Sequence, residues 1–93
     1  MNFEWDLEKN KVNKAKHGIS FAEATTVWDS IHVEVENIAH TENGEVRNAT
    51  LGLIQSKIYV VIWTQRKEII RLISARRARS NEEKVFYKKI QNN

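Results

Sequence analysis

The sequence predicts an α+β fold, in which two N-terminal helices precede a four-stranded antiparallel sheet and a C-terminal helix follows it. Apolar residues recur at helical spacing in the first third of the chain and near its end, and they alternate with polar residues in between. The connections between the alternating segments are short, which favours antiparallel neighbours arranged as a meander. With 93 residues the chain is long enough for one small domain, and we expect that domain to span residues 1–93.

The first helix is expected over residues 7–17. Asp6 can cap its N-terminus, because a short acidic side chain accepts hydrogen bonds from the first free backbone amides. Gly18 follows, and a residue without a Cβ atom readily takes the left-handed conformation that ends many helices. These two residues define both ends of the predicted helix.

The second helix is expected to begin directly afterwards and to end near Asp29. Ser20 and Glu23 have the spacing of a capping box, in which each side chain accepts a hydrogen bond from the backbone of the other residue. The apolar face that follows consists of Phe21, Ala24, Thr25 and Trp28. The two helices are therefore predicted to form a tight pair.

Four strands are expected over residues 32–36, 46–54, 57–64 and 68–75. The first alternates valine with polar residues, which suits a half-exposed strand. The third is apolar on both faces, so we expect it in the centre of the sheet. A second capping box, formed by Ser80 and Glu83, is expected to open the last helix, whose inward-facing residues would be Val85, Phe86 and Ile90.

The composition, with 41% apolar and 29% charged residues, is typical of a soluble globular protein. The chain has no cysteine, which excludes a disulfide framework and a thiolate metal site. No apolar run approaches the roughly 20 residues that cross a membrane, so we expect a cytoplasmic protein without membrane association. The three histidines lack the spacing of a zinc site, and we expect neither a metal nor a cofactor.

The net charge of +3 is unevenly distributed. Between Arg66 and Arg79 there are six basic residues and one acid, and between Lys9 and Lys16 there are four lysines and no acid. Residues 34–45 carry four glutamates and no base. This asymmetry suggests a nucleic-acid face and a separate surface for a partner, whereas the alternative for the lysines is an ordinary solvated helix.

The most informative segment runs from Arg71 to Arg79 and contains four arginines, at the expected exit of an edge strand. Arginine can hold phosphate oxygens two at a time. Arg71 and Arg76 have opposite parity on an extended strand, so they converge only if the chain bends or bulges near Ser74-Ala75. Arg47, near the start of the second strand, could join them across the sheet. The alternative is a set of ion pairs with Glu68, Glu82 and Glu83.

Two further groups could take part in proton transfer. Histidine exchanges protons near neutral pH, so Lys16-His17 at the end of the first helix could supply a general acid. The alternative is a histidine that caps its own helix. Glu83 and Tyr87 lie one helical turn apart on the last helix, where a carboxylate and a phenol could act together, or could merely complete the capping box and the core.

Together these residues resemble the BrnT family of toxins. The N-terminal part of the resemblance is carried by Phe3-Glu4-Trp5-Asp6, Lys9, Asn13, Lys16-His17-Gly18-Ile19, Phe21 and Ala24. The remainder is carried by Arg47, Gly52, the segment from Arg71 to Ala78, Glu83 and Tyr87. The acid and the tyrosine after Ala78 are displaced by about one residue from the family's pattern, so Glu82 and Glu83 are alternative candidates.

The resemblance implies a ribonuclease toxin of a type II toxin–antitoxin system, with a fold similar to that of RelE. Its partner would be a BrnA-like antitoxin with a ribbon-helix-helix DNA-binding region, and the complex would bind operator DNA and repress its own operon. The implied activity is metal-independent endoribonuclease cleavage of mRNA, which inhibits translation.

The same resemblance implies roles for residues on the predicted sheet and helices. The candidates for holding the phosphate and moving protons are Arg47, Arg71, Arg76, Lys16 and His17, with Glu83 and Tyr87 in support. The candidates for RNA contact are Lys9, Lys14, Arg66, Arg77 and Arg79. The alternative hypothesis is a non-catalytic module that binds nucleic acid or a partner as part of a transcriptional repressor complex.

Overall fold

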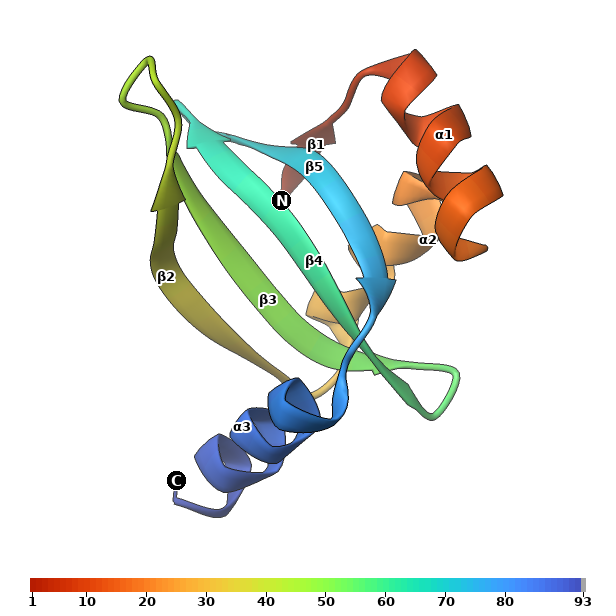
Figure 1. Cartoon of the computed structure of the whole chain (residues 1–93), viewed down its shortest axis with the longest axis vertical. Helices are drawn as coiled ribbons and strands as arrows, with labels where there is room; N and C mark the ends of the chain where they lie inside the picture. The colour runs from red at the N-terminus through yellow and green to blue at the C-terminus, as the bar shows by residue number, and fades with distance from the viewer. Residues whose placement is uncertain (93) are drawn as a thin grey trace.

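The computed structural model describes residues 1–92 and contains one mixed sheet flanked by helices (Figure 1). In chain order its elements are β1 (Asn2–Glu4), α1 (Leu7–His17), α2 (Phe21–Ala24), the 3-10 helix η1 (Thr25–Asp29), β2 (His32–His40), β3 (Val46–Ile54), β4 (Lys57–Arg66), β5 (Ile69–Arg77) and α3 (Ser80–Gln91). The predicted α+β class and the C-terminal helix are confirmed. No helix within residues 1–92 combines the length and the apolar character needed to cross a membrane.

The sheet has five strands in the order β1-β5-β4-β3-β2. Strands β2 to β5 form the predicted antiparallel meander, with β4 in the middle. The prediction of a four-stranded, purely antiparallel sheet is wrong, because β1 adds a short parallel strand beside Ile69–Arg71. The first half of β5 is therefore not an edge, and β5 continues two residues further than predicted, so that Arg76 and Arg77 belong to the strand.

The caps of the first two helices agree with the sequence prediction. Oδ1 of Asp6 accepts hydrogen bonds from the amides of Glu8 and Lys9 at 2.9 and 3.0 Å. Gly18 ends α1 with a φ of 73°. The capping box that joins Ser20 and Glu23 is present at the start of α2.

The second helix does not run to Asp29 as a regular α-helix, because it tightens into η1 after Ala24. The hydroxyls of Thr25 and Thr26 donate to the carbonyls three residues earlier, each at 2.7 Å. Side-chain hydrogen bonds of this kind compete with the regular helical pattern, and 3-10 turns are frequent at helix ends. The threonines thus account for the change of helix type.

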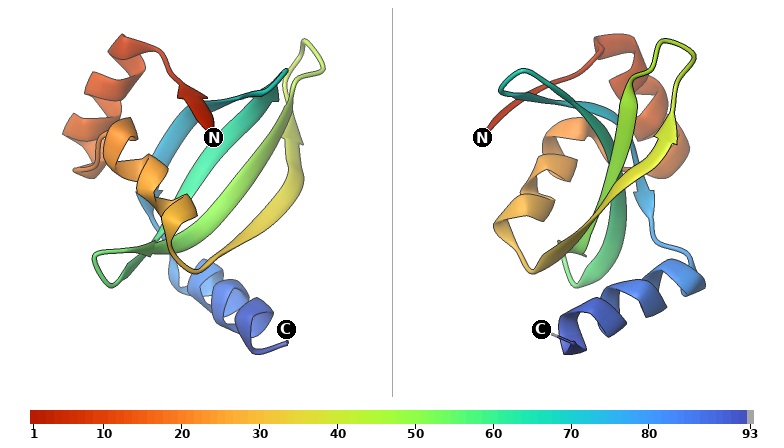
Figure 2. Two further views of the ribbon diagram at one scale, coloured as in Figure 1. Left: turned by 180° about the vertical axis from the view of Figure 1, so that it is seen from behind. Right: turned by 90° about the vertical axis from the view of Figure 1, so that its left-hand side faces the viewer.

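The two faces of the sheet are covered differently (Figure 2). We call the face on which α2 and η1 pack the covered face, and its core includes Phe21, Val27, Trp28, Val61, Trp63, Leu72 and Ala75. We call the other face the open face. Only α3 packs on it among the described helices, through Phe86 against Ala49, Leu51, Ile58 and Val60.

A close contact on the covered face explains a glycine in β3. A Cβ atom at Gly52 would lie 2.5 Å from Cγ2 of Val27, which belongs to η1. Only a residue without a side chain lets η1 approach β3 this closely. Gly52 therefore has a packing role.

Helix α3 begins one residue earlier than predicted. Its N-cap is Arg79 rather than Ser80, and its capping carboxylate is Glu82 rather than Glu83. Oε1 of Glu82 accepts a hydrogen bond from the amide of Arg79 at 2.8 Å and is also bound by Arg76. The second interaction depends on the folded sheet, so the sequence pattern alone could not select between the two glutamates.

Candidate functional site

Strand β5 contains one residue more than β4 over the stretch where the two strands pair. Ser74 lies opposite Ile62 and Leu72 lies opposite Trp63, so Ile73 between them has no partner. This arrangement is a β-bulge, which redirects the side chains that follow it. The bulge that was needed for the arginines to converge is therefore present.

The bulge places Arg71 and Arg76 on the same face of the sheet. Arg71 lies opposite Thr64, and Arg76 lies opposite Val60. Thr64 and Val60 are four residues apart on β4, so they point to the same side, and residues paired directly across strands share a face. Because Val60 packs against Phe86 in the core under α3, this side is the open face.

Arg47 of β3 shares the open face with these two arginines. Ala49 pairs with Ile62, and Arg47 lies two residues before Ala49, which places it beside Thr64. Arg47 and Arg71 thus flank Thr64 from the two neighbouring strands. Nε of Arg47 is buried, and no acceptor within residues 1–92 binds it.

Arg76 is held by Glu82 in a two-pronged ion pair. Nη1 and Nη2 of Arg76 donate to the two carboxylate oxygens of Glu82 at 2.8 and 2.7 Å. These hydrogen bonds raise the pKa of Arg76 and lower the pKa of Glu82 relative to their ordinary values. About a quarter of each side chain is exposed, 23% in both cases, so the pair is partly shielded from solvent but still reachable.

Arg71 is held by a carboxylate from the opposite end of the chain. Its Nη1 donates to Oε2 of Glu4 at 2.9 Å. Glu4 lies opposite Arg71 in the parallel β1–β5 pair. The alternative of ion-paired arginines is thus partly realised, although the partners are Glu82 and Glu4, and neither Glu68 nor Glu83 takes part among the ion pairs of the described chain.

Asn13 attaches α1 to the part of β5 that β1 does not cover. Its Nδ2 donates to the carbonyls of Ala75 and Ile19 at 2.9 and 3.0 Å, and its Oδ1 accepts from the amide of Ala75 at 3.1 Å. Asn13 is 6% exposed. This buried amide satisfies backbone groups that an edge strand would otherwise leave free.

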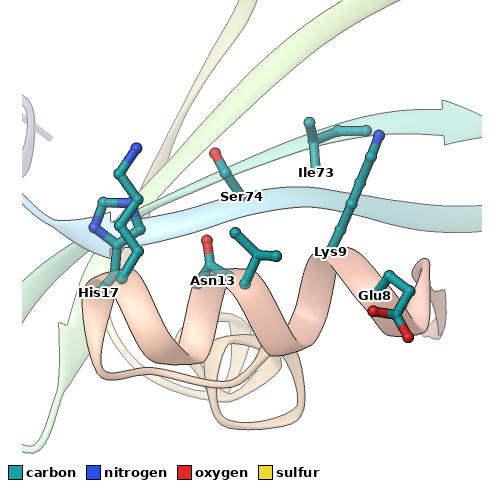
Figure 3. Close-up of a pocket in the computed structure, with 8 residues that line it drawn as sticks. Glu8, Lys9, Asn13, His17, Ile73 and Ser74 are labelled. Carbon is teal, nitrogen blue, oxygen red and sulfur yellow. The ribbon is translucent and has the colours of Figure 1, made fainter.

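A pocket of about 320 Å³ lies between α1 and β5 (Figure 3). Figure 3 shows Lys9 and His17 rising from α1 toward the strand, on the side to which Ser74 also points. The residues that line it are Glu8, Lys9, Val12, Asn13, Lys16, His17, Ile73 and Ser74. Ser74 faces the same side of the sheet as Arg76, two residues further along β5, so the pocket adjoins the arginines.

Two of the basic residues proposed to contact RNA form ion pairs and do not line the pocket beside α1. Nζ of Lys14 binds Glu23 at 2.9 Å in an exposed pair that joins α1 to α2. Arg66, at the end of β4, donates from Nε and Nη2 to Oε2 of Glu45 at 3.2 and 3.0 Å. Lys9, by contrast, lines the pocket.

The remaining candidates follow β5 or lie on α3. Arg77 lies opposite Tyr59, with its guanidinium carbon 5.9 Å from the ring centre, on the covered face. Arg79 is the N-cap of α3. Glu83 and Tyr87 lie on α3, Tyr87 is 53% exposed, and neither lines the pocket beside α1.

Sequence reasoning missed the roles of two residues that organise the site. Glu4 binds Arg71 and Asn13 positions α1, whereas Glu82, which binds Arg76, was among the ion-pair partners considered. Asn13 and Glu4 appeared only as parts of the family pattern. No local signal singled out Asn13 among the polar residues of α1, because its partner Ala75 is 62 positions away.

The arrangement combines fixed cations with groups that can move protons. Guanidinium groups on the open face can stabilise negative charge as it develops on a phosphate. Lys16 and His17 lie at the rim of the same area and include the residue type best suited to proton transfer near neutral pH. Within residues 1–92, no three histidine, aspartate or glutamate side chains come close enough together to hold a metal ion.

Comparison with known proteins assigns a family. The family model described as "Ribonuclease toxin, BrnT, of type II toxin-antitoxin system" matches residues 5–82. The matched range includes Glu82 and ends before Glu83 and Tyr87. No curated protein matches the chain.

Proposed function

The chain belongs to the BrnT family of ribonuclease toxins of type II toxin–antitoxin systems, and on that premise we propose that it is a metal-independent endoribonuclease that cleaves mRNA on the open face. The observation that carries this proposal is the β-bulge at Ile73, which turns Arg71 and Arg76 to one side next to the Lys16-His17 pocket. Cleavage of mRNA in the cytoplasm would inhibit translation.

The proposed reaction is transfer of a phosphodiester to the neighbouring ribose hydroxyl. The 2′-oxygen loses its proton to a base and bonds to phosphorus, and the bond from phosphorus to the 5′-oxygen breaks. The leaving oxygen takes up a proton, so the products are a 2′,3′-cyclic phosphate and a 5′-hydroxyl. Water can then open the cyclic phosphate to a 3′-phosphate.

In this reaction Arg76 binds the oxygens of the scissile phosphate as their charge grows. To do so it exchanges at least one of its hydrogen bonds to Glu82 for a phosphate oxygen. His17 transfers protons and Lys16 binds the phosphate, since both line the pocket that adjoins Ser74. Glu83 and Tyr87 are supporting residues at most, because they lie outside this pocket.

A type II system also includes an antitoxin protein. We propose that this partner is BrnA-like, carries a ribbon-helix-helix region, and represses the operon through the complex on operator DNA. Arg71 and Arg76 already bind carboxylates of their own chain. An acidic segment of the antitoxin could occupy the same guanidinium groups and silence the toxin.

The activity can be tested with purified protein and single-stranded RNA in EDTA. We expect cleavage to persist in EDTA and to yield 2′,3′-cyclic phosphate ends. A substrate with 2′-deoxyribose at the cleavage position should not be cut at that position. Complete loss of cleavage on chelation would reject the metal-independent mechanism. Cleavage at the 2′-deoxy position would reject attack by the neighbouring hydroxyl.

The second hypothesis, a non-catalytic module of a repressor complex, has one structural observation in its favour. Both arginines are bound by internal carboxylates, as they would be if their role were structural. Expression without the antitoxin distinguishes the two hypotheses. Growth arrest that Arg76→Ala relieves supports the enzyme, whereas harmless expression with operator binding supports the module.

A further inference from the structure

We propose that Arg47 and Arg71 form a second phosphate subsite on the open face, distinct from the one at Arg76 and occupied by another backbone phosphate of the same RNA strand. The inference rests on the proposed ribonuclease function for the identity of the ligand. It rests on the sheet geometry for the position of the subsite.

Two arginines flank Thr64 on the open face, and because Nη1 of Arg71 binds Glu4 on β1, its remaining N–H donors are the ones that a ligand beside Thr64 would meet. Arg47 and Arg71 stand on the strands either side of it, and two strand spacings of about 4.8 Å separate β3 from β5. Long side chains can meet across that distance. Thr64 is 1% exposed, and its hydroxyl already donates to the carbonyl of Val46 at 2.7 Å. The hydroxyl therefore takes no part in binding a phosphate, and the two arginines supply the donors.

Arg71 and Arg76 are too far apart along the strands to bind the same phosphate well. The cross-strand partners of Arg71 and Arg76 are four residues apart, which corresponds to about 13 Å along β4. The two arginines are also bound by carboxylates on different elements. Glu4 on β1 binds Arg71, and Glu82 on α3 binds Arg76. Two phosphates of one strand fit this arrangement better than a single phosphate does.

The charge around Thr64 favours an anion. Arg71 and Arg66 each bind one carboxylate, whereas Arg47 has no ion-pair partner in the described part of the chain. Its buried Nε also lacks an acceptor there. A guanidinium in this state leaves a net positive charge, which the phosphate backbone of a single strand can neutralise.

The test compares two RNA lengths on variants that differ at one charge. Oligonucleotides with 2′-O-methyl groups lack the attacking hydroxyl and bind without being cut. A dinucleotide carries a single phosphodiester, and a hexanucleotide also reaches the second subsite. Both are titrated against the wild type, Arg47→Met and the control Lys57→Ala at several salt concentrations. Methionine keeps an aliphatic side chain over Thr64, and circular dichroism checks that the variants fold.

For Arg47→Met we expect hexanucleotide binding about tenfold weaker, since a charge-assisted hydrogen bond is lost. We also expect the slope of log K against log salt to shrink by about 0.7, as for one phosphate of a single strand. Dinucleotide binding should not change. Lys57 is exposed at the far end of β4, and Lys57→Ala should behave as wild type.

Two results would overturn the subsite. One is equal weakening of both oligonucleotides, which would place Arg47 at the same phosphate as Arg76. The other is unchanged hexanucleotide binding by Arg47→Met. That result would show that Arg47 does not bind RNA, and its role would then be to bind an antitoxin carboxylate or to stabilise the fold. The cleavage assay tests a separate proposal. If the wild type binds both oligonucleotides as expected but does not cut unmodified RNA, the ribonuclease proposal is rejected and the phosphate subsite is still supported.

Discussion

The side-chain amide of Asn13 pairs with the backbone of Ala75 as a neighbouring strand would. It donates to the Ala75 carbonyl at 2.9 Å and accepts from the Ala75 amide at 3.1 Å. Ala75 follows the bulge and lies between the two open-face residues Ser74 and Arg76. One buried side chain therefore sets the distance between the helix that carries His17 and the strand that carries the arginines.

Replacing Asn13 should destabilise the protein and impair the site together. Asn13→Ala leaves buried backbone groups of Ala75 and Ile19 without partners, which should cost about 1–3 kcal/mol in the free energy of unfolding. Urea denaturation measures this loss. RNA cleavage should also slow at temperatures where the variant is fully folded, because α1 is no longer fixed against β5.

Lys11→Ala on the same helix provides the control. Lys11 forms an exposed ion pair with Glu8 at 3.5 Å, and such pairs contribute at most about 1 kcal/mol. If Asn13→Ala were as stable as Lys11→Ala, the amide of Asn13 would not hold α1 in place.

Arg76 should contribute to the rate of cleavage. Arg76→Ala should lower the rate about 10²–10³-fold, the usual effect of removing one preorganised donor at a developing anion. Arg76→Lys keeps the charge but loses the two-pronged geometry, so its rate should lie between those of alanine and wild type. Single-turnover cleavage in EDTA measures both variants. Equal rates for Arg76→Ala and the surface control Lys57→Ala would remove Arg76 from the reaction.

Glu82 should stabilise the fold in a pH-dependent way. Arg76 lowers the pKa of Glu82 in the folded state below its ordinary value of 4.5, so the folded protein favours the ionised carboxylate. This stabilisation is complete above pH 4.5 and is lost as the pH falls through the lower, folded pKa. Glu82→Gln should therefore cost about 1 kcal/mol at pH 7.

The difference between Glu82→Gln and the wild type should shrink as the medium becomes more acidic. Urea denaturation at neutral and at acid pH measures it. Glu42→Gln, in the exposed turn between β2 and β3, removes the same charge and should stay within about 0.5 kcal/mol of wild type. A Glu82→Gln penalty that grew toward low pH would contradict the ion pair.

His17 should contribute to the rate of cleavage. Loss of a general acid or base lowers rates about 10²–10⁴-fold, and single-turnover cleavage should show a loss of this size for His17→Ala. His40→Ala, at the exposed end of β2, is the matched control and should cleave at the wild-type rate. A His17→Ala rate equal to that of His40→Ala would assign His17 a structural role.

Local features of the sequence predicted the fold well where neighbouring residues decide the structure. The caps at Asp6 and Ser20 and the end of α1 at Gly18 involve residues only a few positions apart. The strand at Val46–Ile54 was predicted with its observed bounds. Each of these features is specified by short-range hydrogen bonds or by alternation.

The missed features depend on distant partners. Strand β1 is three residues long, too short for a periodic signal, and exists because Ile69–Arg71 pairs with it. The bulge at Ile73, which the sequence indicated only as a condition for the arginines to share a face, follows from the register between β4 and β5. The choice of Glu82 over Glu83 follows from Arg76. The candidate site could therefore be predicted as a set of residues but not as a geometry.

The most direct test of the account is to map RNA contact by methyl NMR on the isoleucine side chains. Ile62 lies on the open face, whereas Ile54 and Ile70 pack against the core of the covered face. Titration with a 2′-O-methyl hexanucleotide should shift the signals of Ile62 and of Ile73, which lines the pocket beside α1. Shifts confined to Ile54 and Ile70, with Ile62 and Ile73 unchanged, would contradict the assignment of the open face as the RNA site.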